Sequence, residues 1–221
     1  MLYIIATPIG NSGDLGARAL TLFEELDVLL CEDTKRTGLF LRALGVKNMP
    51  KLESFYDEVE EEKVFLALAW LKKGLKVGLV SNGGTPLLSD PGWRLVEKCR
   101  REKIGVTSIP GASAVINALV LSGLPMGRFC FLGFLPKKKT ARLKILKNYK
   151  EIEGSKVVYE SPFRLKKLLR DLKDVYGDGL KVAVCREMTK KFEEVTTGLV
   201  EEVTVELENR KIKGEVTVVF I

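Results

Sequence analysis

Short apolar segments alternate with segments of helical periodicity in the first half of the chain. Compact apolar runs predict strands at Leu2–Ala6, Val28–Cys31, Val77–Val80 and Val106–Ile109. Helical spacing of apolar residues predicts intervening helices, one carrying Leu15, Ala19, Leu22 and Leu26 and two more over Lys63–Lys73 and Trp93–Glu102. This alternation is typical of an α/β fold, in which helices pack on a mostly parallel sheet.

A second series of strands and helices follows. Its strands are expected near Phe129–Gly133, Lys156–Glu160, Lys181–Arg186 and Glu215–Ile221, and its basic helices near Ala141–Tyr149 and Leu165–Val175. The chain has 221 residues, which is enough for two small lobes. We therefore predict an N-terminal lobe over residues 1–112 and a C-terminal lobe over 113–221, with the segment 110–125 crossing between them.

The composition narrows the chemistry. Histidine is absent, so proton transfer would depend on Asp, Glu, Lys, Tyr or Cys. The four cysteines are scattered, and we expect no metal site. Apolar runs fall far short of the ~20 residues that span a bilayer, and the start lacks a basic leader, so a cytoplasmic protein is expected. The net charge of +7 suits a polyanion such as RNA, although it would also serve solubility.

Four loops follow predicted strands of the first lobe, where ligands of open α/β sheets collect. They are Thr7–Asn11, Glu32–Arg36, Ser81–Gly92 and Ile109–Ala114. Adjacent glycines at 83 and 84 permit positive φ and expose backbone amides to a ligand. The loops match neither GxGxxG nor the phosphate-gripping P-loop. The alternative is structural: ordinary turns, with Asp33 or Thr34 as a helix N-cap.

The chain resembles a known family. The phrases YIIATPIGNSGDLGARAL, CEDTKRT, SNGGTPLLSDPG, IPGASAVINALVLSGLP, FLGFLPKKK, YESPFR and REMTKKFEE occur in order over nearly the whole chain. They are similar to those of the ribosomal RNA small subunit methyltransferase I family, within the tetrapyrrole (corrin/porphyrin) methylase superfamily. The resemblance implies a homodimer of two α/β lobes, with S-adenosylmethionine as cofactor in the cleft between the lobes. It implies small-subunit ribosomal RNA, or the small ribosomal subunit, as partner, and a cytidine ribose 2′-hydroxyl as methyl acceptor.

The resemblance also implies a cofactor site. Its expected residues in the first lobe and at the junction are Pro8, Ile9, Gly10, Gly84, Thr85, Leu88, Ser113 and Ala114, and in the second lobe Tyr159 and Arg186. One position departs from the family pattern Ser-Asp-Ala-Gly-Thr-Pro, because Asn82 stands where the acid is usual. A lost contact to the cofactor would weaken binding, whereas a lost turn cap would change little.

Catalytic and RNA-binding residues are expected from charge. A base or cation near the ribose hydroxyl would add rate, and the candidates are Glu187 and Lys190, then Glu32 and Asp33. Each is equally interpretable as a surface salt bridge. The predicted phosphate contacts are Lys137, Lys138, Lys139, Arg164, Lys166 and Lys167, on basic segments that also carry Arg142, Lys144, Lys147 and Arg170. Phe129, Phe131 and Phe134 suit a core strand slightly better than a dimer interface.

Two other functions remain open. Another methylase of the superfamily would act on a tetrapyrrole or on a translation factor, although a tetrapyrrole enzyme would not need so many lysines in the second lobe. A non-catalytic assembly factor would bind RNA and cofactor without transferring a methyl group. Methyl transfer to small subunits separates the three.

Overall fold

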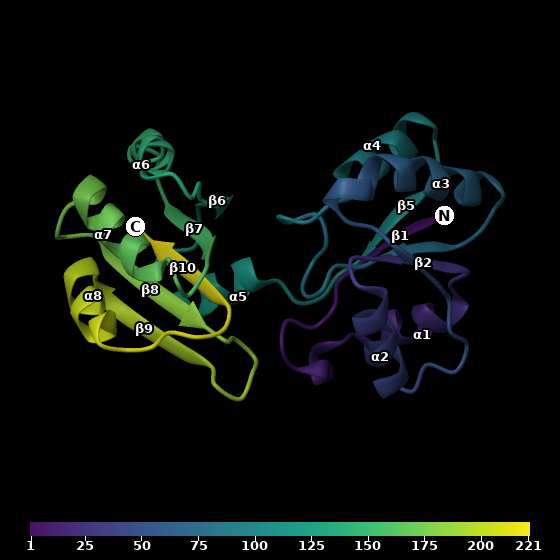
Figure 1. Cartoon of the computed structure of the whole chain (residues 1–221), viewed down its shortest axis with the longest axis horizontal. Helices are drawn as coiled ribbons and strands as arrows, with labels where there is room; N and C mark the ends of the chain where they lie inside the picture. The colour runs from purple at the N-terminus through teal and green to yellow at the C-terminus, as the bar shows by residue number, and fades with distance from the viewer. The chain divides into compact units, whose positions relative to one another are not determined.

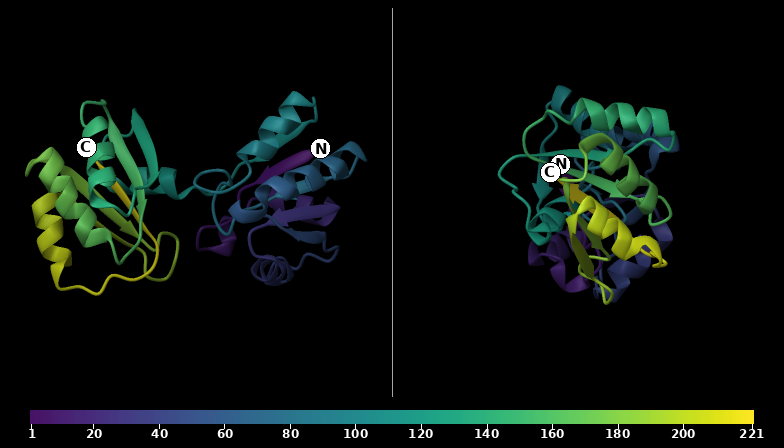
Figure 2. Two further views of the ribbon diagram at one scale, coloured as in Figure 1. Left: turned by 45° about the horizontal axis from the view of Figure 1, so that its top comes forward. Right: turned by 90° about the vertical axis from the view of Figure 1, so that its left-hand side faces the viewer.

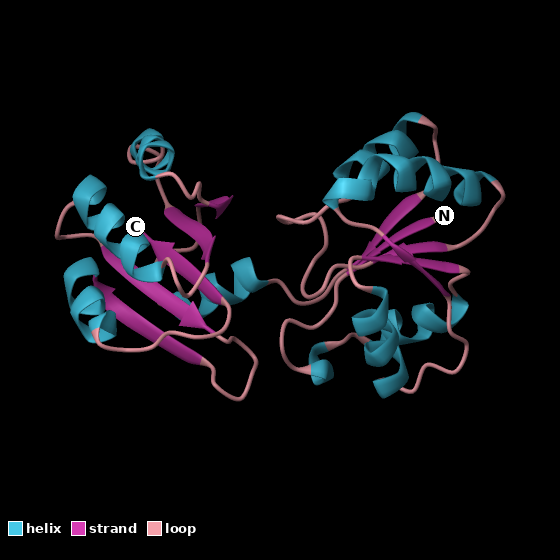
Figure 3. Ribbon diagram, in the orientation of Figure 1, coloured by secondary structure: helices cyan, strands magenta, loops and turns pink.

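The computed structural model describes residues 1–221 and shows two compact units, Met1–Ser113 and Ala114–Ile221. Each unit contains one five-stranded sheet flanked by helices (Figures 1 and 3). None of the helices combines the length and the apolar character needed to cross a bilayer. The predicted α/β class with two lobes, one sheet parallel and one mixed, is confirmed.

The sheet of the first unit is entirely parallel. Its strands are β1 (Leu2–Ile5), β2 (Val28–Cys31), β3 (Lys51–Ser54), β4 (Val77–Leu79) and β5 (Val106–Ile109), in the order β3-β2-β4-β1-β5. Helices α1 (Ala17–Glu25) and α2 (Thr34–Ala43) cover one face, and α3 (Glu60–Lys72) and α4 (Trp93–Arg101) cover the other (Figure 1). Short 3₁₀ turns occupy Ser12–Asp14 and Asp57–Val59. Fully buried side chains such as Phe23 and Leu95 fill the two layers beside the sheet.

The sheet of the second unit is mixed. Its strands are β6 (Phe129–Phe134), β7 (Ser155–Glu160), β8 (Lys181–Arg186), β9 (Glu194–Leu199) and β10 (Val216–Phe220), in the order β6-β7-β10-β8-β9. Only β6 and β7 pair in parallel. Helix α7 (Leu165–Tyr176) packs between α6 (Lys139–Asn148) and α8 (Val200–Glu208), whereas α5 (Ala114–Ser122) contacts β8 and β10 (Figure 2). Leucines of α7 form the main core with β7, β8 and β10.

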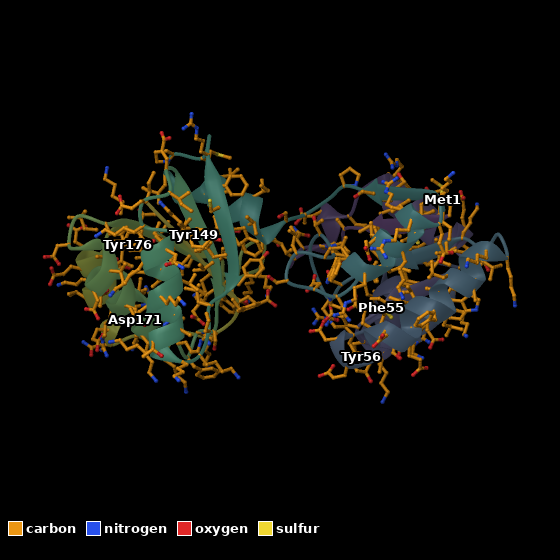
Figure 4. All side chains as sticks on the ribbon, turned by 90° about the horizontal axis from the view of Figure 1, so that it is seen from above. Met1, Phe55, Tyr56, Tyr149, Asp171 and Tyr176 are labelled. Atoms are coloured by element: carbon orange, nitrogen blue, oxygen red, sulfur yellow. The ribbon has the colours of Figure 1, made fainter.

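The structure corrects several predictions from the sequence. The edge strands β3 and β9 and the helix α8 were not predicted. The preference for Phe129 and Phe134 as core residues is wrong, because β6 is an edge strand and their exposed fractions are 41% and 62%. Arg142 does not lie on a solvated helix face, because it is buried and forms an ion pair with Asp171 of α7. Figure 4 labels Asp171.

Strand direction gathers the loops at one edge of each sheet. In the first unit all five strands are parallel, so the loops that follow them lie at the same end of the sheet. We call this carboxyl end of the strands the first edge, as distinct from the outer strands of the sheet. Its loops begin after Ile5, Cys31, Ser54, Leu79 and Ile109. In the second unit β6, β7 and β8 end together, because β6 is parallel to β7 while β7 and β8 are both antiparallel to β10. This second edge also carries the starts of β9 and β10.

Candidate active site

Backbone hydrogen bonds join the loops of the first edge. Thr7 and Gly84 form an isolated antiparallel bridge, in which each backbone N–H donates to the other residue's carbonyl at 2.9 Å. The Thr85 hydroxyl donates to the carbonyl of Ala112 at 3.0 Å. Three of the four predicted loops therefore converge on the glycine pair, from sequence positions up to about a hundred residues apart.

Gly84 is the tightest point of this junction. Its φ is +89°, a conformation that side chains other than glycine rarely adopt. A Cβ at this position would lie 3.3 Å from Cγ2 of Ile9 and 3.7 Å from the carbonyl oxygen of Ala112. Glycine is therefore required here both for its backbone conformation and for the space that its missing side chain leaves.

Ser113 carries a polar atom without a partner at the end of the fourth loop. Its hydroxyl oxygen is shielded from solvent, and it is the only such buried side-chain nitrogen or oxygen in residues 1–221 that lacks a hydrogen bond. A buried hydroxyl without a partner costs about 1–3 kcal/mol. A ligand with a polar group at this loop would remove that cost, which fits the predicted cofactor site.

Asn82 makes no turn cap but contacts the second loop. Its backbone N–H donates to Glu32 Oε1 at 2.8 Å, and its side-chain amide donates to Glu32 Oε2 at 3.1 Å. An aspartate at position 82 would instead place two carboxylates against each other, and one of them would have to hold a proton. Asn82 thus fixes the Glu32 carboxylate at the first edge without that requirement.

Asp33, beside Glu32, has a structural role. Its Oδ1 accepts hydrogen bonds from the backbone N–H groups of Lys35 and Arg36, both at 2.9 Å, and so caps the N-terminus of α2. The capping alternative raised from the sequence describes this residue. The catalytic interpretation of Asp33 stays a prediction.

Two acids of the first edge were missed as site residues. The pKa of Asp90 is raised to about 6, mainly because the carboxyl group is buried. A hydrogen bond with Ser81 acts to lower this pKa, whereas the negative charges of Glu32 and Asp57 act to raise it. Glu60 is buried and accepts the backbone N–H of Gly92 at 2.9 Å, which ties the end of the glycine loop to α3. The only sequence signal for Asp90 was its place in the motif SDPG at the end of the Ser81–Gly92 loop. Its acidic neighbours Glu32 and Asp57 come from other parts of the chain, so a local pattern does not reveal them.

The remaining predicted cofactor contacts of the first unit flank this junction. Pro8 and Ile9 are half-buried, Gly10 is exposed, and Leu88 is 39% exposed. Ala114 is half-buried and begins α5 in the second unit. The partly open apolar side chains of Ile9 and Leu88 suit contact with a ligand rather than a closed core.

The second edge brings Glu187 and Lys190 together. A turn with positive φ at Glu187 and Thr189 places Lys190 Nζ 2.9 Å from Glu187 Oε1 and 2.9 Å from Glu215 Oε2. Glu187 Oε1 also accepts the backbone N–H of Glu215 at 2.9 Å. Burial acts to raise the Glu187 pKa, but this N–H and Lys190 outweigh it, so the pKa of Glu187 is lowered. The Glu187 carboxylate is consequently a weaker base than an ordinary glutamate and forms an ion pair with Lys190, and its catalytic role stays a prediction.

Tyr159 and Arg186 are occupied by neighbours within the second unit. The Tyr159 ring lies between Phe131 and Phe134, with ring centroids 4.8 and 5.4 Å away. The Arg186 guanidinium donates twice to Glu194 Oε2, at 3.1 and 3.0 Å. Nothing in these contacts brings the two residues to one another, and their role in binding cofactor stays a prediction.

The predicted RNA-binding cations divide into two groups. Three have partners in the protein: Lys139 with Asp171 and Asp174, Arg164 with buried Glu160, and Lys166 with the carbonyl of Glu208. Lys137, Lys138 and Lys167 are exposed and form no ion pair. Lys144 and Lys147 on α6 are likewise exposed and unpaired. The cations available to a phosphate backbone are therefore fewer than the basic composition indicates.

Residues 1–204 match the family described as Tetrapyrrole (Corrin/Porphyrin) Methylases. The chain belongs to the tetrapyrrole methylase family. Methylases of this family depend on S-adenosylmethionine, so the predicted cofactor is confirmed. The predicted resemblance is confirmed as well.

Two relatives illustrate the match across the methylase family. The "Ribosomal RNA small subunit methyltransferase I" of Thermotoga maritima is 43% identical over 219 residues, which cover 99% of this chain and 97% of the relative. The protein of the same name from Haemophilus influenzae is 43% identical over 196 residues, or 89% of this chain and 69% of the relative.

Solved methylases share the fold at low identity. Uroporphyrin-III C-methyl transferase from Thermus thermophilus, complexed with S-adenyl homocysteine, has a TM-score of 0.67 at 17% identity and covers 99% of this chain and 96% of its own. The methyltransferase CobJ has a TM-score of 0.73 at 16% identity, covering 99% and 92%. These likenesses establish the two-unit methylase fold.

Proposed function

We propose that this methylase transfers a methyl group from S-adenosylmethionine to the ribose 2′-hydroxyl of a cytidine in small-subunit ribosomal RNA. The observation that carries the proposal is the match to the Thermotoga maritima relative, which extends over 97% of that protein at 43% identity. The exposed, unpaired lysines of the second unit support a polyanionic acceptor.

The first edge is the proposed cofactor site. Gly84 leaves room for a ligand against the backbone, and the Ser113 hydroxyl needs a hydrogen-bond partner. Pro8, Ile9, Gly10, Thr85, Leu88 and Ala114 are the further proposed contacts, and the family resemblance adds Tyr159 and Arg186. When bound, the cofactor supplies a methyl group on a sulfonium, which is already activated, so alignment of the acceptor oxygen contributes much of the rate.

The acceptor hydroxyl must also lose its proton. The structure offers one carboxylate whose pKa approaches neutrality, that of Asp90 at about 6, and a general base works best when its pKa lies near the working pH. Lys190, held by Glu187 and Glu215, is the proposed cation that stabilises the developing oxyanion. Glu187 then acts as the positioning residue of Lys190, with Glu32 fixed by Asn82 at the first edge.

Labelled methyl transfer tests the function. Unmodified small ribosomal subunits and free small-subunit RNA are each incubated with the protein and labelled S-adenosylmethionine, and nuclease mapping with mass spectrometry locates the label. We expect one labelled cytidine, with the methyl group on the ribose. Label on a tetrapyrrole or translation factor instead would assign another branch of the family, and cofactor binding without transfer would assign an assembly factor.

We also propose that the protein works as a homodimer, as the family resemblance implies. Exposed apolar side chains outside the two edges, such as Leu39 at 65% and Val205 at 69% exposure, suit a protein interface. Light scattering at micromolar concentration should report twice the 24.6 kDa mass of one chain, and a single-chain mass would refute the dimer.

A further inference from the structure

Three phenylalanines at the second edge are unusually exposed, and two of them lie near the ends of β6 and β7, while Phe192 lies between β8 and β9. Phe163, in the turn after β7, is 89% exposed, and Phe134, the last residue of β6, is 62% exposed. Phe163 is the most exposed of the large apolar side chains in residues 1–221. We call Phe134, Phe163 and the neighbouring Tyr159 the aromatic platform. Large apolar side chains that gather at the surface beside a site commonly mark an interaction surface.

The platform is held in place rather than being a loose loop. Phe134 pairs in register with Tyr159, and their ring centroids are 5.4 Å apart. The turn carrying Phe163 is closed by the backbone N–H of Arg164, which donates to the carbonyl of Ser161 at 2.9 Å. The backbone N–H of Phe163 donates to the Ser161 hydroxyl at 3.3 Å. The exposure of both rings is therefore a property of an ordered surface.

One guanidinium joins the two segments. Arg164 donates to both carboxylate oxygens of buried Glu160, at 2.6 and 2.9 Å, and also to the carbonyl of Leu135 at 2.9 Å. Leu135 directly follows Phe134, so the ends of β6 and β7 are tied together beside the two rings. Because the Glu160 carboxylate neutralises the Arg164 guanidinium, Arg164 fixes the positions of the two segments but offers no unpaired positive charge to a ligand.

The free charge beside the platform is positive. Lys137 and Lys138 follow Phe134 by three and four residues, are exposed and form no ion pair. Glu160, the acid nearest in sequence to Phe163, is buried against Arg164. Aromatic faces next to unpaired lysines match single-stranded RNA, whose bases stack on rings while its phosphates contact cations. A second copy of this chain that presents the same surface would instead bring like charges together.

We propose that the aromatic platform binds unpaired nucleotides of the RNA substrate by base stacking on Phe134 and Phe163, while Lys137 and Lys138 contact the adjoining phosphates. This inference rests on the proposed function, and it adds that the acceptor must be presented in an unpaired, splayed segment. Bases in a duplex are already stacked on one another, and their faces are not available to a ring.

Binding to paired and unpaired RNA tests the platform. An RNA oligonucleotide and the same strand annealed to its complement are titrated against wild-type protein, Phe163→Ala and Phe134→Ala. Stacking on an aromatic side chain contributes about 1–3 kcal/mol per base, so each variant should lose about 5- to 150-fold in affinity for the unpaired strand. Affinity for the duplex and the salt dependence of binding should be unchanged. Phe163→Trp should retain binding to the unpaired strand.

Phe65→Ala is the matched control. Phe65 lies on α3 of the first unit and is 61% exposed, close to the 62% of Phe134. Equal losses in Phe163→Ala and Phe65→Ala, or equal losses for paired and unpaired RNA, would overturn the platform. A change from dimer to monomer mass in Phe163→Ala would overturn it too, by assigning the rings to a contact between copies.

Wild-type methyl transfer separates this inference from the proposed function. If the wild type methylates small-subunit RNA while Phe163→Ala and Phe134→Ala bind unpaired RNA normally, the platform alone is wrong. If the wild type methylates no RNA, the proposed function fails whatever the platform variants bind.

Discussion

The two sheet edges satisfy their polar groups in opposite ways. At the first edge, backbone groups of distant loops pair with each other, while the Ser113 hydroxyl is left without a partner. At the second edge, charged side chains neutralise one another in ion pairs such as Lys190 with Glu187 and Arg186 with Glu194. A buried polar group without a partner favours binding of a ligand that satisfies it, whereas ion pairs between side chains favour a fixed local structure.

This contrast changes how the charges of the second unit are understood. The basic composition indicates a continuous surface for RNA, yet Lys139, Arg142 and Arg164 are engaged with acids of the same unit. What remains open at the second edge is a small number of lysines and exposed aromatic rings. The proposed RNA contacts therefore include Lys137 and Lys138 near Phe134, while Lys144, Lys147 and Lys167 are the exposed, unpaired lysines on the helices.

The largest expected effect comes from filling the first edge. Gly84→Val should abolish cofactor binding, because a β-branched side chain at φ +89° would be strained and would meet Ile9 and the Ala112 carbonyl. Titration calorimetry with S-adenosylmethionine should show one site per chain in the wild type and no heat in the variant. Gly16→Ala, where a Cβ meets nothing within 4 Å, should bind normally. Normal binding by Gly84→Val would remove the glycine loop from the site.

The second-largest effect concerns the ion pairs of the second edge. Lys190→Ala should lower turnover by about 100-fold, or about 2.7 kcal/mol of barrier, with cofactor affinity nearly constant. Glu187→Gln should lower turnover less, because Lys190 keeps its 2.9 Å contact with Glu215. The double variant should fall well short of the summed effects, since the two residues act as one unit.

A purely structural pair would behave differently. In that case Lys190→Ala would lower the free energy of unfolding while single-turnover rates of the folded enzyme stayed normal. Rates and denaturation measured on the same preparation distinguish the two outcomes.

A change of pH should alter the free energy of unfolding in opposite directions through the acids of the two edges. Asp90 has a folded pKa of about 6 against an ordinary value of 3.8, so the folded state binds more protons between these values. Stability from this group therefore falls as pH rises from about 4 to 6, by about 1–2 kcal/mol after allowance for its partial exposure. Glu187 and Glu194 have lowered pKa values, so their contribution is complete above the ordinary glutamate pKa and is lost at lower pH.

Asp90→Asn isolates the first of these effects. The variant should be more stable than the wild type at pH 7 and about equal to it at pH 4, as measured by urea unfolding at several pH values. A stability difference that does not vary with pH would show that Asp90 is not a buried acid. If Asp90 also accepts the ribose proton, the same variant should lose turnover above pH 6.

The smallest expected effect is on the salt dependence of RNA binding. Replacing Lys137 and Lys138 with alanine should reduce the slope of log affinity against log salt by about 1.4, or about 0.7 for each phosphate contact to a single strand. Adding Lys139→Ala should change the slope little more, because Lys139 already pairs with Asp171 and Asp174. An unchanged slope in the triple variant would identify all three as ordinary surface lysines.

The sequence pattern located strands β2, β5 and β8 with the predicted bounds. Strand β2 is fully buried and β8 is buried over residues 182–185, so their apolar runs leave little ambiguity, whereas β5 is a partly exposed edge strand. Strand β3, Lys51–Ser54, escaped prediction because it lies at a sheet edge, where strands are short and polar. Strand β9 is likewise polar and at an edge.

The site was predictable as loops but not as contacts. Glycines and strand ends identify the loop around Gly84 from the sequence alone, because both have local signatures. The contact of Asn82 with Glu32 joins positions 50 residues apart and depends on β2 and β4 being neighbours. The raised pKa of Asp90 likewise depends on burial, which no local pattern expresses.

The strand orders have a consequence for how the chain folds during synthesis. In the first sheet the central strand β4 is made fourth, and it pairs with β2 and β1, whose residues precede it by about 49 and 75 positions. In the second sheet the central strand β10 is made last, and before it appears β6–β7 and β8–β9 have no strand between them. The first unit can therefore close on the ribosome as soon as Ile109 emerges. The second unit must wait for Val216–Phe220, so its folding is the slow, final step of maturation.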